Sequence, residues 1–166
     1  MDKGVELSLQ SKKEIEDKLV SEAIEARQNS YSPYSHFAVG AAVLGVRQEQ
    51  KADSELPLNT DIDNPGNVRI FTGCNIENAS YGLTICAERT AIFSAVSQGF
   101  RKVEAIAIVA AGDMPYPCGA CRQVLSEFAA TPEIPVVVVK VDDEGKPIVC
   151  EEYTLMELLP KGFSLS

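Results

Sequence analysis

Runs of apolar residues along this chain are separated by polar, turn-forming stretches. Five of these runs are rich in Val, Ile and Ala and predict β-strands. They span Phe37–Val46, Val68–Cys74, Val103–Ala110, Val136–Val141 and Pro147–Cys150. The Val136–Val141 run is almost continuously apolar, which is typical of an interior strand that is buried on both faces.

The segments around these runs carry the spacing of three and four residues that is typical of amphipathic helices. Four helices are predicted: from Ser11 to about Asn29, from Thr84 or Ile85 to Gly99, from just after Cys118 through Phe128, and from Thr154 to Pro160. The first and last begin with a capping box, in which Ser or Thr is followed three residues later by Glu. Glycine after the second is a common helix stop.

The order of these elements predicts one α/β domain over residues 1–166, built as a three-layer sandwich around a mixed five-stranded sheet. A crossover helix joins the third and fourth strands, so these two should run parallel. Only a few residues join the last two strands, which should therefore pair antiparallel. The stretch at about 47–67 is polar, mostly acidic and contains two prolines, so it is predicted to be an acidic loop insertion.

Charge and hydropathy exclude several classes of partner. The formal net charge is -9, with 15 Lys and Arg against 24 Asp and Glu, which disfavours binding to nucleic acid or to an anionic membrane. No apolar run approaches the roughly 18 residues that span a bilayer. The residues Met1–Lys18 lack the apolar core of a signal peptide. We therefore expect a cytoplasmic protein, in which cysteines stay reduced.

Candidate chemistry lies in the cysteines, because the single histidine, His36, sits in a turn-like stretch and is expected to be a solvated loop residue. Cys118 and Cys121 form a Cys-x-x-Cys pair that alone could indicate zinc, redox chemistry or neither. A thioredoxin-like dithiol would leave Cys86 and Glu88, two residues apart, unexplained.

Cys74 and Cys150 fall in or at the end of predicted strands, and we interpret them as small buried thiols. Three cysteine ligands then remain, with an open fourth position that is typical of catalytic zinc. Both ligand segments begin helices, where backbone N–H groups favour thiolates. Glu88, on the first turn of its helix, could reach water on the metal.

Cys86-Ala87-Glu88 followed by Pro117-Cys118-Gly119-Ala120-Cys121 matches the zinc-deaminase signature, in the version with cysteine in place of histidine. With its other motifs, the chain closely resembles the small cytidine deaminases that form homotetramers. The resemblance runs from about Ser21 to Ser166, without the acidic insertion. The other motifs are Ser32-Pro33-Tyr34-Ser35-His36-Phe37, the run Gly73–Tyr81, Arg89-Thr90-Ala91, Arg122-Gln123 and Glu157-Leu158-Leu159-Pro160.

The resemblance implies zinc-dependent hydrolysis of cytidine and deoxycytidine to uridine and deoxyuridine plus ammonia, a step of pyrimidine salvage. By position, it implies that Cys86, Cys118 and Cys121 are the zinc ligands, that Glu88 is the proton shuttle and that Arg89 hydrogen-bonds the ligand sulfurs. It also implies that the aromatic ring of Phe37 packs on the base and that Asn75 and Glu77 contact the ribose. Ala79, Tyr81 and Phe163 match pocket residues, some of which are donated by neighbouring subunits. A carboxylate at the sugar would repel phosphate, which favours free nucleosides.

Three alternatives remain open. A deaminase of another aminopyrimidine nucleoside, such as blasticidin S, would share the zinc motifs, but the run Asn75–Ala79 favours cytidine. A nucleic-acid deaminase would need a basic surface, which this composition does not favour. A zinc-stabilised binding module without turnover would tolerate Glu88→Ala, whereas an enzyme would keep its zinc and lose turnover.

Overall fold

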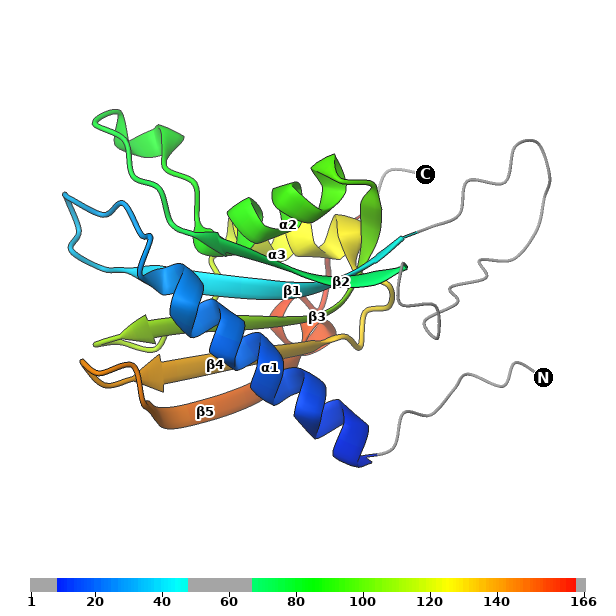
Figure 1. Ribbon diagram of the computed structural model, residues 1–166. Helices are drawn as coiled ribbons and strands as arrows, with labels where there is room; N and C mark the ends of the chain where they lie inside the picture. The colour runs from blue at the N-terminus through cyan, green and yellow to red at the C-terminus, as the bar shows by residue number, and fades with distance from the viewer. Residues whose placement is uncertain (1–8, 48–66, 164–166) are drawn as a thin grey trace, which may run out of the picture.

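The computed structural model describes residues 9–47 and 67–163 (Figure 1). Five strands form one sheet in the order β2-β1-β3-β4-β5. These strands are β1 (Val39–Arg47), β2 (Val68–Cys74), β3 (Phe100–Ala111), β4 (Pro135–Val141) and β5 (Pro147–Thr154). β3 and β4 run parallel, and every other neighbouring pair is antiparallel. The mixed sheet and the antiparallel last pair confirm the predicted fold class.

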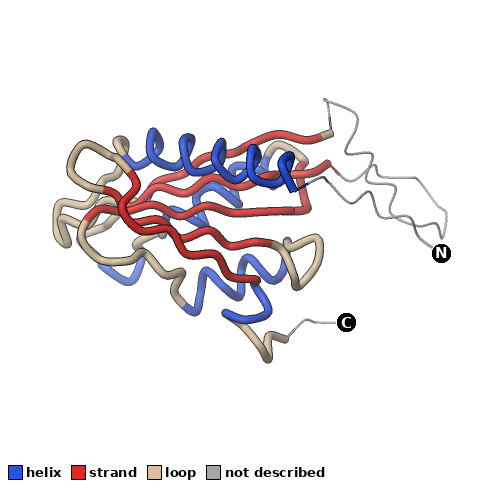
Figure 2. Tube along the Cα trace, turned by 90° about the horizontal axis from the view of Figure 1, so that it is seen from below, coloured by secondary structure: helices blue, strands red, loops and turns tan. Residues whose placement is uncertain are grey.

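The helices cover both faces of this sheet, as Figure 2 shows. They are α1 (Leu9–Arg27), α2 (Ala87–Ser97), α3 (Gly119–Phe128) and α4 (Leu155–Leu158). Leu19 and Ala23 of α1 pack in one apolar core, whereas buried residues of α2, α3 and α4 belong to a second core on the opposite face. The three-layer sandwich is therefore confirmed, and none of the helices in the described segments is long and apolar enough to cross a membrane.

β4 shows why one run of the sequence is almost continuously apolar. Val136 and Val138 face the core beneath α2 and α3, whereas Val137 and Val139 face the core beneath α1. Alternate residues of a strand point to opposite faces, so a strand covered on both sides needs apolar residues at nearly every position. The prediction of an interior strand is confirmed.

Several element boundaries differ from the prediction, among them the start of the third strand, which begins at Phe100 and not at Val103. The first helix begins at Leu9, so Ser11 lies inside it and not at its N-cap. The second begins at Ala87, because Ile85 is held extended by two backbone hydrogen bonds with Ile76, of 2.9 and 3.0 Å. The last strand continues to Thr154 through its pairing with β4. Tertiary pairing therefore decides boundaries that local sequence patterns leave open.

Other predicted boundaries are met closely. The capping box of Thr154 and Glu157 is present at α4. Gly99 follows α2 with a φ of 88°, a left-handed conformation that suits glycine. The predicted acidic insertion lies mostly outside the described residues, but its two ends meet where the Arg47 amide donates to the Asn67 carbonyl at 2.8 Å.

Gly73 allows α2 to lie directly against β2. A Cβ atom at this position would overlap the backbone of α2 at Ala87 and Ala91. The close approach fixes the start of α2 relative to the sheet. The candidate ligand Cys86 and the acid Glu88 lie at this end of the helix.

Candidate active site

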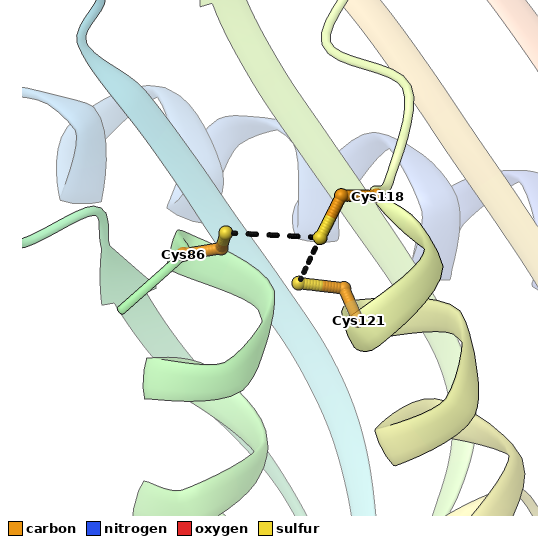
Figure 3. A group of neighbouring side chains, drawn as sticks. All are labelled: Cys86, Cys118 and Cys121. Atoms are coloured by element: carbon orange, nitrogen blue, oxygen red, sulfur yellow. Dashed lines mark hydrogen bonds between the residues drawn. The ribbon is translucent and has the colours of Figure 1, made fainter. Parts of the chain in front are cut away.

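Two helix starts bring the three candidate cysteine ligands together (Figure 3). Cys86 is the N-cap residue of α2, and Cys118 is the N-cap residue of α3. Cys121 lies on the first turn of α3. The Cys86 and Cys118 sulfurs are 4.0 Å apart, and those of Cys118 and Cys121 are 3.5 Å apart.

The sulfur positions fit a tetrahedral zinc ion. All three sulfurs lie within 4.8 Å of one another. Two thiolates bound at about 2.3 Å with a tetrahedral angle would be roughly 3.8 Å apart, close to the separations observed. Among the described residues, no other group of three or more potential ligands lies close enough together to hold a metal ion. A donor set of three sulfurs leaves a fourth coordination position, as catalytic zinc sites do.

Arg89 supports negative charge at this cluster. Its Nη2 donates to the Cys86 sulfur at 3.5 Å and to the Thr84 carbonyl oxygen at 3.0 Å. Hydrogen bonding from the Cys121 thiol and from Arg89 lowers the pKa of Cys86 to about 5. The contact with Cys86, together with burial, raises the pKa of Cys121. Cys86 is therefore more ready than Cys121 to be a thiolate.

Glu88 is a buried acid beside this cluster. It lies on the first turn of α2 and is only 5% exposed. Burial, with a contribution from the nearby Cys86 charge, raises the pKa of Glu88 to about 7. A carboxyl group with such a pKa can both accept and release a proton near neutral pH, which is what a proton shuttle requires.

A cleft of about 220 Å³ lies in front of the cysteines. Seven of the residues predicted for the site line it: Phe37, Asn75, Glu77, Tyr81, Cys86, Glu88 and Cys118. The structure thus brings a predicted base contact, predicted sugar contacts and predicted metal ligands to one cavity, although they come from segments far apart in the chain.

Hydrogen bonds to Glu77 fix its carboxylate in this cleft. Glu77 accepts from the Tyr34 amide at 2.8 Å, the Ser35 amide at 3.2 Å and the Tyr81 hydroxyl at 3.4 Å. Burial alone would raise its pKa, but hydrogen bonds from Ser35, Tyr34 and Tyr81 outweigh this effect and hold the pKa of Glu77 below its usual range. The cleft therefore presents a fixed negative charge that can accept from hydroxyl groups.

Asn75 connects the end of β2 to the segment that carries Phe37. Its Oδ1 accepts from the Val39 amide at 2.9 Å, and its Nδ2 donates to the Phe37 carbonyl at 2.8 Å. Ser30 also donates to Oδ1. This network fixes the position of Phe37, and it leaves the second Nδ2 hydrogen as the donor that a ligand could use.

The amino-acid pattern of the cytidine and deoxycytidylate deaminase zinc-binding region matches residues 13–140, which is more than half of the chain. The chain belongs to the cytidine and deoxycytidylate deaminase family. This family has a zinc-binding region, and the cysteine cluster described above could hold such an ion.

Similar proteins lead to the same family. The chain is 41% identical over 149 residues to a cytidine deaminase of Sporosarcina psychrophila, covering 89% of this chain and 90% of the relative. It is 44% identical over 147 residues to a cytidine deaminase of Halalkalibacterium halodurans, covering 88% and 92%. The crystal structure of cytidine deaminase from Burkholderia pseudomallei superimposes with a TM-score of 0.66 at 36% identity, covering 89% of this chain and 98% of that one.

Two of the predicted pocket residues of this deaminase-family chain lie outside the cleft. Ala79 is exposed, in the turn before Tyr81. Phe163 is 68% exposed and follows α4, where its carbonyl accepts from the Gln123 Nε2 at 3.0 Å. Neither side chain contributes to the cavity formed by its own chain.

The predicted roles of the remaining cysteines and of the histidine have different outcomes. Cys150 is exposed, because β5 is an edge strand with most residues in contact with solvent. Cys74 is only half-buried, so the interpretation of both as buried thiols is wrong. His36 is an exposed loop residue with a φ of 55°, as predicted.

Seven other residues line the cleft without having been predicted as site residues, and Thr84, Pro115 and Tyr116 are among them. Pro115 and Tyr116 directly precede the Pro117–Cys121 motif, so their proximity to Cys118 was a signal in the sequence. What no local pattern indicates is that the Tyr116 ring is held at the cleft by a residue of β5.

Proposed function

We propose that this protein is a zinc-dependent cytidine deaminase that hydrolyses cytidine and deoxycytidine to uridine and deoxyuridine and releases ammonia, as in pyrimidine salvage. The observation that carries this function is a cluster of three thiols beside a buried acid, at a cleft lined by Cys86, Cys118 and Glu88. Relatives of similar length with 41% and 44% identity are cytidine deaminases. The fixed negative charge of Glu77 favours a sugar with free hydroxyls over a nucleotide.

Cys86, Cys118 and Cys121 are the proposed zinc ligands. Zinc held there would lower the pKa of water and so provide the nucleophile for C4 of the cytosine ring. The Arg89 guanidinium offsets the excess negative charge of three thiolates through its hydrogen bond to Cys86.

Glu88 is the proposed proton shuttle. Its carboxylate accepts one proton from the attacking water and delivers it to N3 of the ring. It then takes the remaining hydroxyl proton from the adduct at C4 and delivers it to the departing amino group, which leaves as ammonia. Burial makes this exchange possible, because it brings the pKa of Glu88 to about 7. The low exposure of the acid also keeps bulk water from competing for these protons.

Substrate orientation falls to the other residues of the cleft. Phe37 packs against the base, while Asn75 and Glu77 bind the sugar hydroxyls through one donor and one acceptor. Tyr81 donates to Glu77 and so holds that acceptor in place. Binding two ends of the nucleoside presents C4 to the nucleophile in a fixed geometry.

We also propose a homotetramer that acts in the cytoplasm. Ala79 and Phe163 are exposed and lie outside the cleft of their own chain, which suits residues that complete a neighbouring subunit's pocket. All cysteines in the described segments are free thiols, which suits a reducing compartment. Light scattering after size-exclusion chromatography tests the assembly, and a fully active monomer would contradict it.

An absorbance assay of cytidine, deoxycytidine, cytosine, CMP and blasticidin S, with and without a zinc chelator, tests the function. We expect turnover of the first two, loss with chelator and recovery with added zinc. Glu88→Gln should retain zinc, since no ligand changes, and should lower kcat by about 10²–10⁴-fold. The control Glu127→Gln alters an exposed acid on α3 and should behave as wild type. Full activity of Glu88→Gln would contradict the mechanism.

A further inference from the structure

Tyr116 is an aromatic residue of the cleft to which neither the zinc site nor the sugar contacts assign a role. It lines the cavity together with Pro115 and Cys118. It lies between Pro115 and Pro117, which restrict the backbone on either side. Its amide donates to the Met114 carbonyl at 3.0 Å, which closes a tight turn. The backbone around Tyr116 is therefore constrained two residues before a zinc ligand.

Glu151 of β5 holds the phenol end of Tyr116. The Tyr116 hydroxyl donates to Glu151 Oε2 at 2.7 Å, and the Tyr153 hydroxyl donates to the same oxygen at 2.6 Å. The two rings pack edge to face with centroids 6.1 Å apart. Such short distances are typical of hydrogen bonds to an ionised acceptor.

The sheet gives Glu151 a fixed position. Glu151 pairs with Val138 of β4, whose side chain is fully buried in the core. Because β4 is an interior strand, the backbone of Glu151 cannot move without breaking its pairing with the sheet. The hydrogen bond therefore connects the loop between β3 and α3 to a rigid part of the molecule, across 35 residues of sequence.

We propose that Glu151 and Tyr153 position Tyr116 as a wall of the substrate cleft, and that the Tyr116 ring sets the affinity for the nucleoside. This inference rests on the proposed deaminase function. The Tyr116 hydroxyl is committed to Glu151, so Tyr116 acts through its ring and not as a proton donor to substrate. An apolar wall contacts the ground state and the transition state about equally, and such uniform binding changes KM and leaves kcat unaltered.

Steady-state kinetics with cytidine on Tyr116→Phe, Glu151→Ala and the double variant test this role. Each single variant releases the ring from its anchor, and KM should rise roughly three- to tenfold at unchanged kcat and zinc content. The double variant should show the same KM as the single variant with the higher KM, because both substitutions remove the same hydrogen bond between Tyr116 and Glu151. Glu152→Ala is the matched control: it removes the same charge from the next residue of β5, which is exposed, and should keep the wild-type KM.

Several results would overturn this inference. They are a wild-type KM in both single variants, an additive effect in the double variant, or a loss of zinc and kcat at constant KM, which would indicate a merely structural role. Amide hydrogen exchange of residues 112–116 gives a readout independent of turnover, and it should be faster in both single variants and not in Glu152→Ala. An inactive, zinc-loaded wild-type protein would refute the proposed function, whereas an active wild type with unchanged variants would refute only the role of Tyr116.

Discussion

Replacing Gly73 by alanine tests whether the contact between β2 and α2 sets the geometry of the metal centre. A Cβ at this position would lie 2.4 Å from the Ala91 amide nitrogen and 2.8 Å from the Ala87 carbonyl oxygen. Both atoms belong to the backbone of α2, so no side-chain rotation can relieve the overlap. Because an ordinary contact between heavy atoms lies at about 3.5 Å, α2 must move away from the sheet by roughly 1 Å.

This movement should affect both activity and stability. Cys86 and Glu88 would move with α2, whereas Cys118 and Cys121 would stay with α3. A misplacement of about 1 Å can lower catalytic efficiency roughly 100-fold. Overpacking of this kind costs about 1–3 kcal/mol of unfolding free energy. For a domain of this size, that cost corresponds to a Tm lower by roughly 2–12 °C.

The assay compares kcat/KM for cytidine, bound zinc and Tm between wild type, Gly73→Ala and Gly82→Ala. Gly82 is the matched control, because a Cβ there would meet no atom within 4 Å. We expect Gly82→Ala to resemble wild type in all three measurements. A Gly73→Ala protein with wild-type kcat/KM and Tm would refute the view that this contact sets the position of the ligands.

Two further predictions concern residues around the cleft. Arg89→Ala removes the hydrogen bond to the Cys86 sulfur, so zinc affinity should fall about 10–100-fold in competition with a chelator, and unchanged affinity would contradict the role of Arg89. Phe163→Ala should raise KM for cytidine without changing the proposed tetramer in light scattering, because Phe163 is proposed to reach a neighbouring pocket. A wild-type KM would contradict this role of Phe163.

The sequence predicts most of this fold because its strands are simple apolar runs. Val136–Val141 had to be interior, since such a run can be buried only between two layers. The start of α2 could not be predicted to the residue, because it depends on pairing between Ile76 and Ile85 in the folded chain. The exposure of Cys150 depends on β5 being an edge strand, which only the strand order decides.

The residues of the site likewise fall into those that local sequence patterns predict and those that depend on contacts in the folded chain. The motifs Cys-x-Glu and Cys-x-x-Cys at helix starts are local patterns, so the sequence alone points to Cys86, Cys118 and Cys121 as ligands. The position of Tyr116 next to the Pro117–Cys121 motif was a signal that it lies near the site, but its hydrogen bond to Glu151 could not be predicted, because the two residues are 35 positions apart and no local pattern links them. Residues that act through long-range side-chain contacts are thus the ones that sequence patterns miss.

The path of the chain explains why ligand and cleft wall come from one loop. Cys86 and Cys118 are 32 residues apart. Between them the chain leaves the cleft along α2, turns at Gly99 and returns along β3, whose last residues lie beside Val39 at the cleft. The residues after β3 must therefore meet the start of α2, and the short loop 112–117 provides both Tyr116 and the approach to Cys118. Backbone changes in this loop should alter zinc geometry and substrate affinity together, whereas Tyr116→Phe, which keeps the backbone, can separate the two.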